Sequence, residues 1–176
     1  EDALRESEEK FRRLVEVAPV AIIITDETGD ITLVNDQAQL LFSYPRVELL
    51  DQSVELLVPD YARKSHAHNR AAYMAAPRVR RMGIGLELFA RRKDGSQFPV
   101  EIELSYVQTA TGLMVMSFII DITERKQADA DLRAQRDFLQ LVINSVPDLI
   151  MVKDRAGRFQ LVNEPAAHLF DLTTAT

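Results

Sequence analysis

The sequence offers few side chains that could bind a metal ion or act as a nucleophile. It has no cysteine and three histidines, of which His66 and His68 stand close together. We expect residues 60–76 to form a helix that ends before Pro77, and side chains at positions i and i+2 of a helix point about 200° apart. His66 and His68 therefore cannot share one ion, whereas a single neutral imidazole such as His66 can ligate a haem iron from one side.

The sequence carries no recognisable catalytic motif, so we expect no enzyme activity. The absence of cysteine excludes disulfides, thiolate metal ligands and thiol nucleophiles. Gly83 and Gly85 have the spacing of a dinucleotide-binding loop, but Leu88 stands at the third glycine position and a strand is expected to follow. Four acidic residues lie at expected turns or helix starts, where capping explains them better than acid–base chemistry: Asp26, Asp36, Asp60 and Asp154.

The composition is that of an ordinary globular chain and narrows the function further. Hydrophobic residues make up 47% of the 176 residues and charged residues 27%. The net charge of -6 argues against nucleic-acid binding, which needs clustered Lys and Arg. The apolar runs are too short to span a bilayer, so we expect no membrane insertion by these residues. The absence of cysteine and of a signal-peptide pattern fits a cytoplasmic protein.

The sequence contains an internal repeat. Residues 11–42 recur without a gap as residues 139–170, at an offset of 128 (163 − 35). A period of this length is too long for a solenoid unit and indicates tandem domains. We expect a complete domain at residues 11–123 and the truncated start of a second at 145–176, within a longer protein. The matched positions include Pro19 with Pro147, Asp26 with Asp154, Gly29 with Gly157, and Asn35 with Asn163.

The first copy has the pattern of an α+β domain. Short β-branched runs bounded by turn residues predict strands, and Asn35 is a suitable N-cap for the helix that follows it. The order of the elements predicts one five-stranded antiparallel sheet with helices packed on one face. The expected elements are strands 21–25 and 31–35, helix 36–42, helical turns 47–57, helix 60–76, and strands 86–92, 97–107 and 114–122.

Two further patterns appear in the second half of the first copy: an alternation in the expected strand 97–107 and a basic cluster before the expected strand 86–92. Phe98, Val100, Ile102 and Leu104 alternate with polar residues, which predicts a strand with one wet face. The basic cluster lies between Pro77 and Gly83 and is expected to solvate a loop. It consists of Arg78, Arg80 and Arg81.

A linker helix is predicted at residues 124–144, which contain no Pro or Gly and many strong helix formers. Its a and d positions indicate a short coiled coil between two copies of the chain; the alternative is one amphipathic helix docked on its own domain. We expect a homodimer held by this helix and by a charged N-terminal helix at residues 1–10. The contact of the N-terminal helix is expected around Leu4, Phe11 and Val15. The linker positions are Ala128, Leu132, Gln135 (the polar exception), Leu139, Val142 and Val146.

Two motifs resemble those of the PAS domain family. Residues 91–100, RRKDGSQFPV, are similar to the PAS hairpin, and residues 121–125, DITER, resemble the motif at which the last PAS strand becomes a signalling helix. The resemblance extends over residues 11–176 and implies a sensory module, followed by the start of a second PAS domain. Such a module binds a small ligand and passes the change through its helical linker to an output domain, such as a histidine kinase of a two-component system or a diguanylate cyclase. The alternative is a ligand-free dimerisation and relay module.

The position of His66 resembles that of the proximal haem ligand in the rhizobial oxygen-sensing PAS kinases. A b-type haem sensor of gas or redox state is therefore a second alternative. Leu86 stands where those sensors have a distal Arg, and Asn69 and Arg70 are polar where a haem would favour apolar contacts. The absence of cysteine excludes a covalent flavin adduct but not a bound flavin, so the cofactor stays unassigned.

We predict a ligand pocket between the inner face of the sheet and the helix at 60–76. The periodicity places ten side chains toward it: Ile22, Ile24, Leu33, Leu41, Val58, His66, Tyr73, Ile102, Leu104 and Phe118. We predict signal relay at the exit from the last strand, where Asp121 or Thr123 can cap the linker helix and Arg125 can pair with Asp121. The relay residues are Asp121, Ile122, Thr123 and Arg125.

Overall fold

The computed structural model describes residues 2–82, 87–110 and 112–170. The chain forms two compact units, Glu1–Thr123 and Glu124–Thr176. Three residues singled out in the sequence lie outside the described residues: Gly83, Gly85 and Leu86. Leu86 was the predicted start of a strand and the position aligned with a distal Arg.

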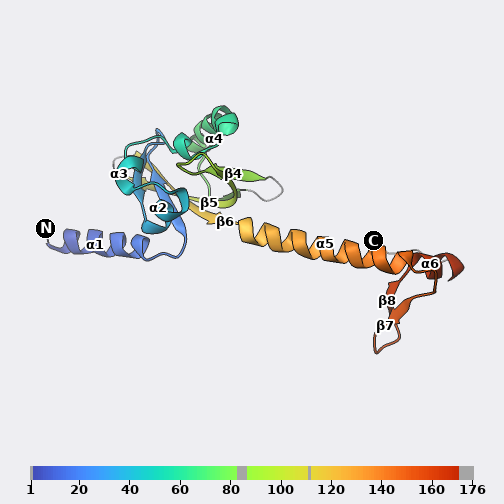
Figure 1. Cartoon of the computed structure of the whole chain (residues 1–176). Coiled ribbons are helices and arrows are strands. Elements are labelled where there is room, and N and C mark those ends of the chain that lie inside the picture. The colour runs from blue at the N-terminus through green and yellow to red at the C-terminus, as the bar shows by residue number, and fades with distance from the viewer. Residues whose placement is uncertain (1, 83–86, 111, 171–176) are drawn as a thin grey trace. The chain divides into compact units, whose positions relative to one another are not determined.

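The first unit contains an antiparallel sheet of six strands (Figure 1). The strands follow the order β2-β1-β6-β5, and both β3 and β4 pair with the free edge of β5. The α+β class and the antiparallel sheet are confirmed. The strands are β1 (Ala21–Thr25), β2 (Ile31–Val34), β3 (Arg80–Met82), β4 (Leu88–Arg91), β5 (Gln97–Thr109) and β6 (Gly112–Asp121).

The prediction of five strands missed β3. Arg80 and Arg81 were expected in a loop, but Arg80 pairs with Leu104 and Met82 with Ile102 along the edge of β5. The β4 strand continues along the same edge, where Leu88 pairs with Val100. An edge strand of three residues with two arginines gives no apolar period, so its pairing comes from the exposed backbone of β5.

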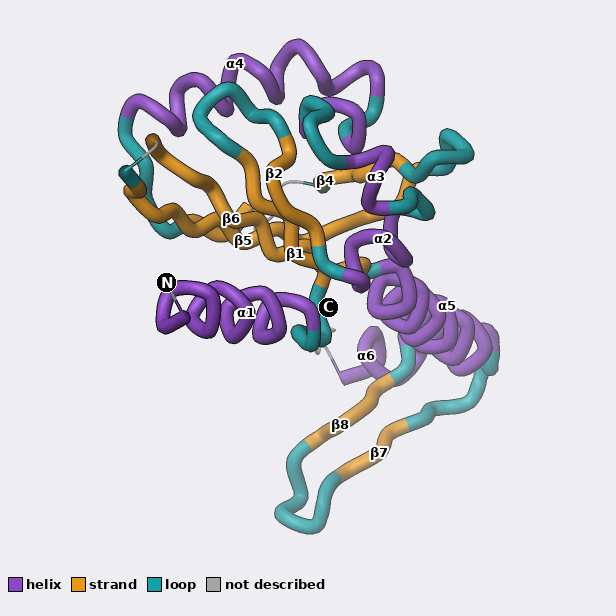
Figure 2. The backbone as a smooth tube through the Cα atoms, turned by 90° about the vertical axis from the view of Figure 1, so that its left-hand side faces the viewer, coloured by secondary structure: helices purple, strands orange, loops and turns teal. Residues whose placement is uncertain are grey.

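Short helices cover one face of the sheet, and the N-terminal helix lies against the other (Figure 2). The prediction that all the helices of the domain pack on one face is therefore corrected for α1, which also runs beyond the predicted residues 1–10. Val15, near its end, is buried against Ile22 and Ile24. The helices are α1 (Asp2–Glu16), α2 (Asp36–Phe42), α3 (Arg46–Leu49) and α4 (Arg63–Ala75), with 3-10 turns at Val54–Leu57 and Asp60–Ala62.

The main core lies between the sheet and helices α2 and α3. Ile23, Ile31 and Leu49 are fully buried there, and the rings of Phe42 and Phe98 pack edge to face with centroids 5.8 Å apart. The predicted alternation of β5 is confirmed at Phe98 and Val100, which are both buried in this core.

The second unit repeats the opening of the first. It consists of α5 (Thr123–Ser145, whose first residue belongs to the first unit), β7 (Met151–Lys153), β8 (Phe159–Val162) and α6 (Glu164–Phe170). Lys153 pairs with Phe159 as Thr25 pairs with Ile31, and both hairpins have a register shift at the same point. No helix among the described residues has an apolar stretch long enough to cross a membrane.

Candidate functional site

A pocket lies beside one face of α4. His66, Asn69, Arg70, Tyr73 and Met74 line it, and their spacing of three and four residues places them on one side of the helix. Helix α4 begins after Pro59 and a 3-10 turn, and Ser65 Oγ donates a hydrogen bond to Ala62 O in its first turn. His66 and His68 both lie on this α-helix, as predicted, so only His66 faces the pocket.

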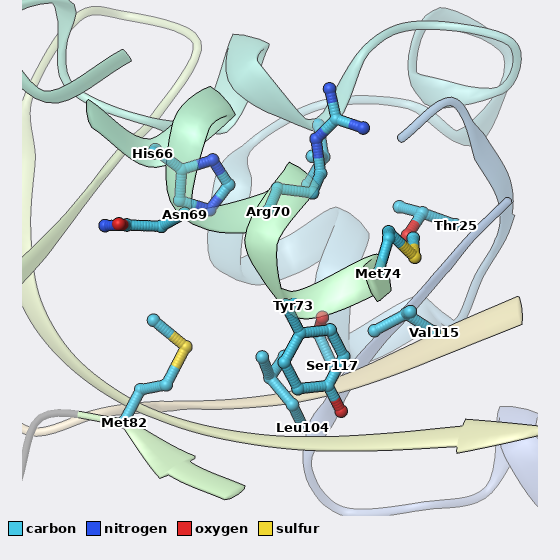
Figure 3. Close-up of a pocket in the computed structure, with 11 residues that line it drawn as sticks. Thr25, His66, Asn69, Arg70, Tyr73, Met74, Met82, Leu104, Val115 and Ser117 are labelled. Carbon is cyan, nitrogen blue, oxygen red and sulfur yellow. The ribbon is translucent and has the colours of Figure 1, made fainter. Parts of the chain in front are cut away.

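The opposite wall is a patch of small and medium side chains on the sheet (Figure 3). Leu104 and Ser117 are register partners on β5 and β6, and Val115 pairs with Thr25 of β1. Met82 and Val54 complete the lining. The cavity measures about 70 Å³, whereas an engineered cavity that admits benzene measures about 150 Å³. Its enclosed space therefore suits a molecule of a few heavy atoms.

A carboxylate holds two of the pocket side chains in place. The Glu55 side chain is 17% exposed; its Oε2 lies 2.8 Å from His66 Nδ1 and its Oε1 lies 3.3 Å from Arg70 Nε. A carboxylate favours a proton on the Nδ1 that faces it, which leaves Nε2 of a neutral ring as an acceptor. The Arg70 charge is balanced by Glu55, so the pocket carries no unpaired cation from this pair.

Arg70 also joins α4 to the turn between β1 and β2. Its Nη1 donates a hydrogen bond to Thr28 O, and a Cβ on Gly29 would overlap its guanidinium group. Gly29 has a φ of +92°, which L side chains rarely adopt. The Asp26 carboxylate accepts hydrogen bonds from the backbone N–H groups of Thr28, Gly29 and Asp30. Burial acts to raise the pKa of Asp26, but a hydrogen bond from the Thr28 hydroxyl and these backbone bonds outweigh it and lower the pKa, so Asp26 caps the turn.

The structure brings three of the ten predicted lining residues to the pocket: His66, Tyr73 and Leu104. Leu41 and Ile102 pack against the main core on the same side of the sheet. Val58 is half-buried next to α4 and is absent from the lining. The role of these residues in ligand binding stays a prediction.

The other four predicted residues lie on the opposite face of the sheet, which corrects the predicted lining. Ile22 pairs with Phe118, and both belong with Ile24 and Leu33 to the cluster beneath Val15 of α1. All five residues of β1 are buried because β1 is central and covered on both faces, so its sequence has no alternation. Periodicity could not decide which of its faces meets α4.

Helical spacing in the sequence could have found three of the missed residues. Asn69, Arg70 and Met74 follow from His66 and Tyr73 by helical spacing alone. Thr25, Val115 and Ser117 follow from Leu104 only through the strand register, and the small Ser117 lies at the floor where the large Phe118 was expected. Val54 and Met82 come from elements that are distant in the sequence or were not predicted.

At the exit of the first unit, the Asp121 carboxylate joins three elements. Its Oδ1 accepts a hydrogen bond of 2.8 Å from Thr123 N at the start of α5, and its Oδ2 pairs with Arg92 Nη2 at 2.9 Å. The guanidinium group of Arg92 lies 3.8 Å from the centroid of the Phe98 ring, and its Nε donates to Leu41 O. Ile122 is buried, and its N–H donates to Pro99 O. Arg92 is thus an ion-pair partner of Asp121 that the sequence did not predict, and the predicted pair of Arg125 with Asp121 stays a prediction.

Comparisons with known families agree with this geometry. Residues 9–122 match the family described as PAS fold, and residues 137–176 match a family described as PAS domain. The chain belongs to the PAS family. The opening of a second PAS domain accounts for the internal repeat.

The curated relatives include sensor proteins. Sensor protein FixL of Bradyrhizobium diazoefficiens is 30% identical over 133 residues, which are 76% of this chain and 26% of that protein. Oxygen sensor protein DosP of Escherichia coli is 24% identical over 157 residues, 87% of this chain and 17% of that protein. The chain thus spans about a quarter or less of the length of these two relatives.

A solved structure supports the fold. The PAS domain of an HTR-like protein from Haloarcula marismortui superposes with a TM-score of 0.56 at 22% identity, covering 69% of this chain and 96% of that domain. The likeness shows the fold alone.

Two glycines with similar backbone angles test the contact between Arg70 and the turn. Gly29 and Gly95 have φ values of +92° and +87°, so replacement by Ala should cost each about 1–2 kcal/mol from backbone strain. Only Gly29→Ala should cost more, because nothing lies within 4 Å of a Cβ at Gly95. Urea unfolding followed by circular dichroism measures both.

The double variant Gly29→Ala with Arg70→Ala shows whether the extra cost comes from Arg70. Measured against the single variant Arg70→Ala, which carries the cost of losing the Arg70 contacts, the additional cost of Gly29→Ala should equal that of Gly95→Ala. Equal costs for the two single variants would contradict the placement of Arg70 over the turn.

Proposed function

We propose that the first PAS domain senses a small molecule in the pocket between α4 and the sheet. The main support for this proposal is a partly polar cavity where α4 meets the sheet, at a place where a core side chain would otherwise fill the space. Asn69, Thr25 and Ser117 supply hydrogen-bonding groups, while Met82, Leu104 and Val115 supply apolar surface. The ligand class that suits this lining is a small organic molecule with one polar end, such as a short-chain acid or alcohol.

A haem does not fit the described residues. The bond from His66 Nδ1 to Glu55 is typical of a metal-ligating histidine. However, the cavity holds far less than a macrocycle, and Asn69 and Arg70 occupy the helix face beside His66. A flavin ring system is likewise larger than the cavity. No step of the proposed function therefore uses either cofactor.

The proposed route from the pocket to the linker follows strand β6. Val115 and Ser117 of β6 line the pocket, and Asp121 ends the same strand. A ligand that displaces the floor of the pocket acts on a strand whose last residue caps α5. Arg92 braces this end by pairing with Asp121 and by stacking on Phe98. We propose Asp121, Ile122, Thr123 and Arg92 as the relay, with Arg125 of the predicted set in the first turn of α5.

The parent protein is proposed to be a cytoplasmic signalling protein with an output domain beyond this chain. The sensor names of the relatives support a histidine kinase or a similar output, and the absence of cysteine fits a reducing compartment. A ligand-free PAS dimerisation and relay module is the competing function. It would share the junction at Asp121 but would not respond to small molecules.

Filling the pocket tests ligand sensing. Thermal unfolding of the chain should shift upward with at least one member of a panel of short carboxylic acids and alcohols, because a ligand that binds only the folded state stabilises it. Ser117→Leu should abolish the shift, since its side chain occupies the cavity floor.

Leu40→Ala is the matched control, because Leu40 is 72% exposed and far from the lining. It should leave the shift intact. A shift that survives Ser117→Leu would place binding elsewhere. A Soret band in freshly purified protein that disappears in His66→Ala would contradict the exclusion of haem.

The ion pair at the junction tests the relay. In the parent protein, Arg92→Gln should reduce the response of the output to ligand by about fivefold or more, the usual scale of coupling between sites. Ligand affinity should stay near normal, because Arg92 does not line the pocket.

Lys93→Gln is the control for a loss of stability alone, because it removes the ion pair between Lys93 and Glu48 and keeps the pair between Arg92 and Asp121. It should lower stability slightly and preserve the response. A full response in Arg92→Gln, accompanied only by lower stability, would reduce the junction to a structural cap.

We also propose a parallel homodimer through α1 and α5. The predicted dimer contact at Val15 is corrected, because Val15 is buried against Ile22 and Ile24 of its own domain. We place the contact of α1 at Leu14 and Val17, which are 70% and 76% exposed. The heptad positions Leu132 and Leu139 of α5 are 67% and 61% exposed. Sedimentation equilibrium should show a dimer that Leu132→Glu with Leu139→Glu weakens. The control, Lys126→Glu with Arg133→Glu, changes residues outside the a and d positions. A monomer at high micromolar concentration would contradict the proposal.

A further inference from the structure

The side chain of Asn163 is fully buried and joins α5 to the second PAS domain. Its Nδ2 donates to Ile143 O at 3.1 Å, in the last turn of α5, and to Asp148 O at 2.8 Å. Its Oδ1 accepts from Ile150 N at 3.0 Å, next to β7, and from Ala166 N at 3.2 Å, in α6. One amide group thus holds the end of the helix, the first strand and the following helix together.

Asn35 makes the same set of bonds in the first domain. Its Nδ2 donates to Val15 O at 3.1 Å, in the last turn of α1, and to Val20 O at 2.8 Å. Its Oδ1 accepts from Ile22 N at 2.9 Å and from Ala38 N at 3.0 Å. Each of these four partners is 128 residues before the corresponding partner of Asn163, so the incoming helix of each domain is held in the same way.

A second contact supports each of these attachments. In the first domain, Arg46 pairs with Glu16, the last residue of α1, and with Asp36, the first residue of α2. In the second, Asn144 Oδ1 accepts from Glu164 N at 3.0 Å. Positions 144 and 164 correspond to positions 16 and 36, although the chemistry of the contact differs.

We infer that Asn163 is the input point at which α5 controls the second PAS domain. A turn or shift of the end of α5 moves Ile143 O, and Asn163 must follow or lose a buried hydrogen bond, which is unfavourable because a buried polar group is left unsatisfied. Because Asn163 also holds Ile150 N and Ala166 N, the hairpin and α6 move with it. None of the described residues of α5 is buried. The helix is therefore attached to the second domain by the hydrogen bonds of Asn163 and Asn144 at its end. The inference does not depend on ligand binding in the first pocket.

Distance measurements between two spin labels test this coupling in the whole chain. The protein has no cysteine, so Arg133→Cys on α5 and Arg155→Cys in the β7–β8 turn, both exposed, would be the only labelled sites. Asn163→Asp keeps the oxygen that accepts from Ile150 and Ala166 but removes the N–H donors to the helix. We expect the distance distribution to broaden by about twofold or more as the helix is released. Amide exchange at residues 150 and 166 should remain slow.

Asn35→Asp is the matched control, because it breaks the same bonds in the other domain. It should leave the distance distribution between positions 133 and 155 unchanged. It should broaden the distribution between Glu9→Cys on α1 and Gln108→Cys on β5. A distribution in Asn163→Asp as narrow as in the wild type would overturn the inference. If Asn163→Asp unfolds the second unit, the same test is made in the first domain. A distance distribution between positions 9 and 108 that stays narrow in Asn35→Asp would overturn the inference equally.

Discussion

A buried asparagine amide is the constraint on which each PAS domain of this chain is built. Asn35 is fully buried, and its two amide atoms bond the end of α1, the start of β1 and the first turn of α2. A buried amide left without these partners costs more than it contributes when satisfied, so the three elements are held together. Asn163 repeats the arrangement in the second domain, where the helix that it holds is the exit helix of the first.

Strand β6 is the proposed connection between sensing and output in the first domain. The central strand β1 is buried on both faces, because one face of the sheet lies toward the pocket and the other packs against α1. The small side chain of Ser117 on β6 leaves room for the cavity, and Asp121 at the end of the strand caps α5. Pocket, sheet and linker are therefore joined by one strand whose far end is braced by Arg92.

Local signals in the sequence predicted the elements well, and non-local contacts limited the prediction of the site. Strands β1 and β2, helix α2 and the hairpin of β5 follow from turn residues, capping and alternation. The inward face of β1 could not be read, because Ile22, Ile23 and Ile24 are all apolar and all buried. Glu55 holds His66 and Arg70 from a different helical turn, and Arg92 reaches Asp121 from a hairpin. Such pairs depend on tertiary packing and have no spacing in the sequence.

Hydrogen exchange at the start of α5 tests most directly whether the pocket is coupled to the linker. Ser117→Leu mimics an occupied pocket without requiring the natural ligand. The account predicts altered protection of the amides of Ile122 and Thr123 in Ser117→Leu, and loss of this effect when Arg92→Gln is added. Changes confined to the amides around residue 117, with Ile122 and Thr123 exchanging as in the wild type, would contradict it.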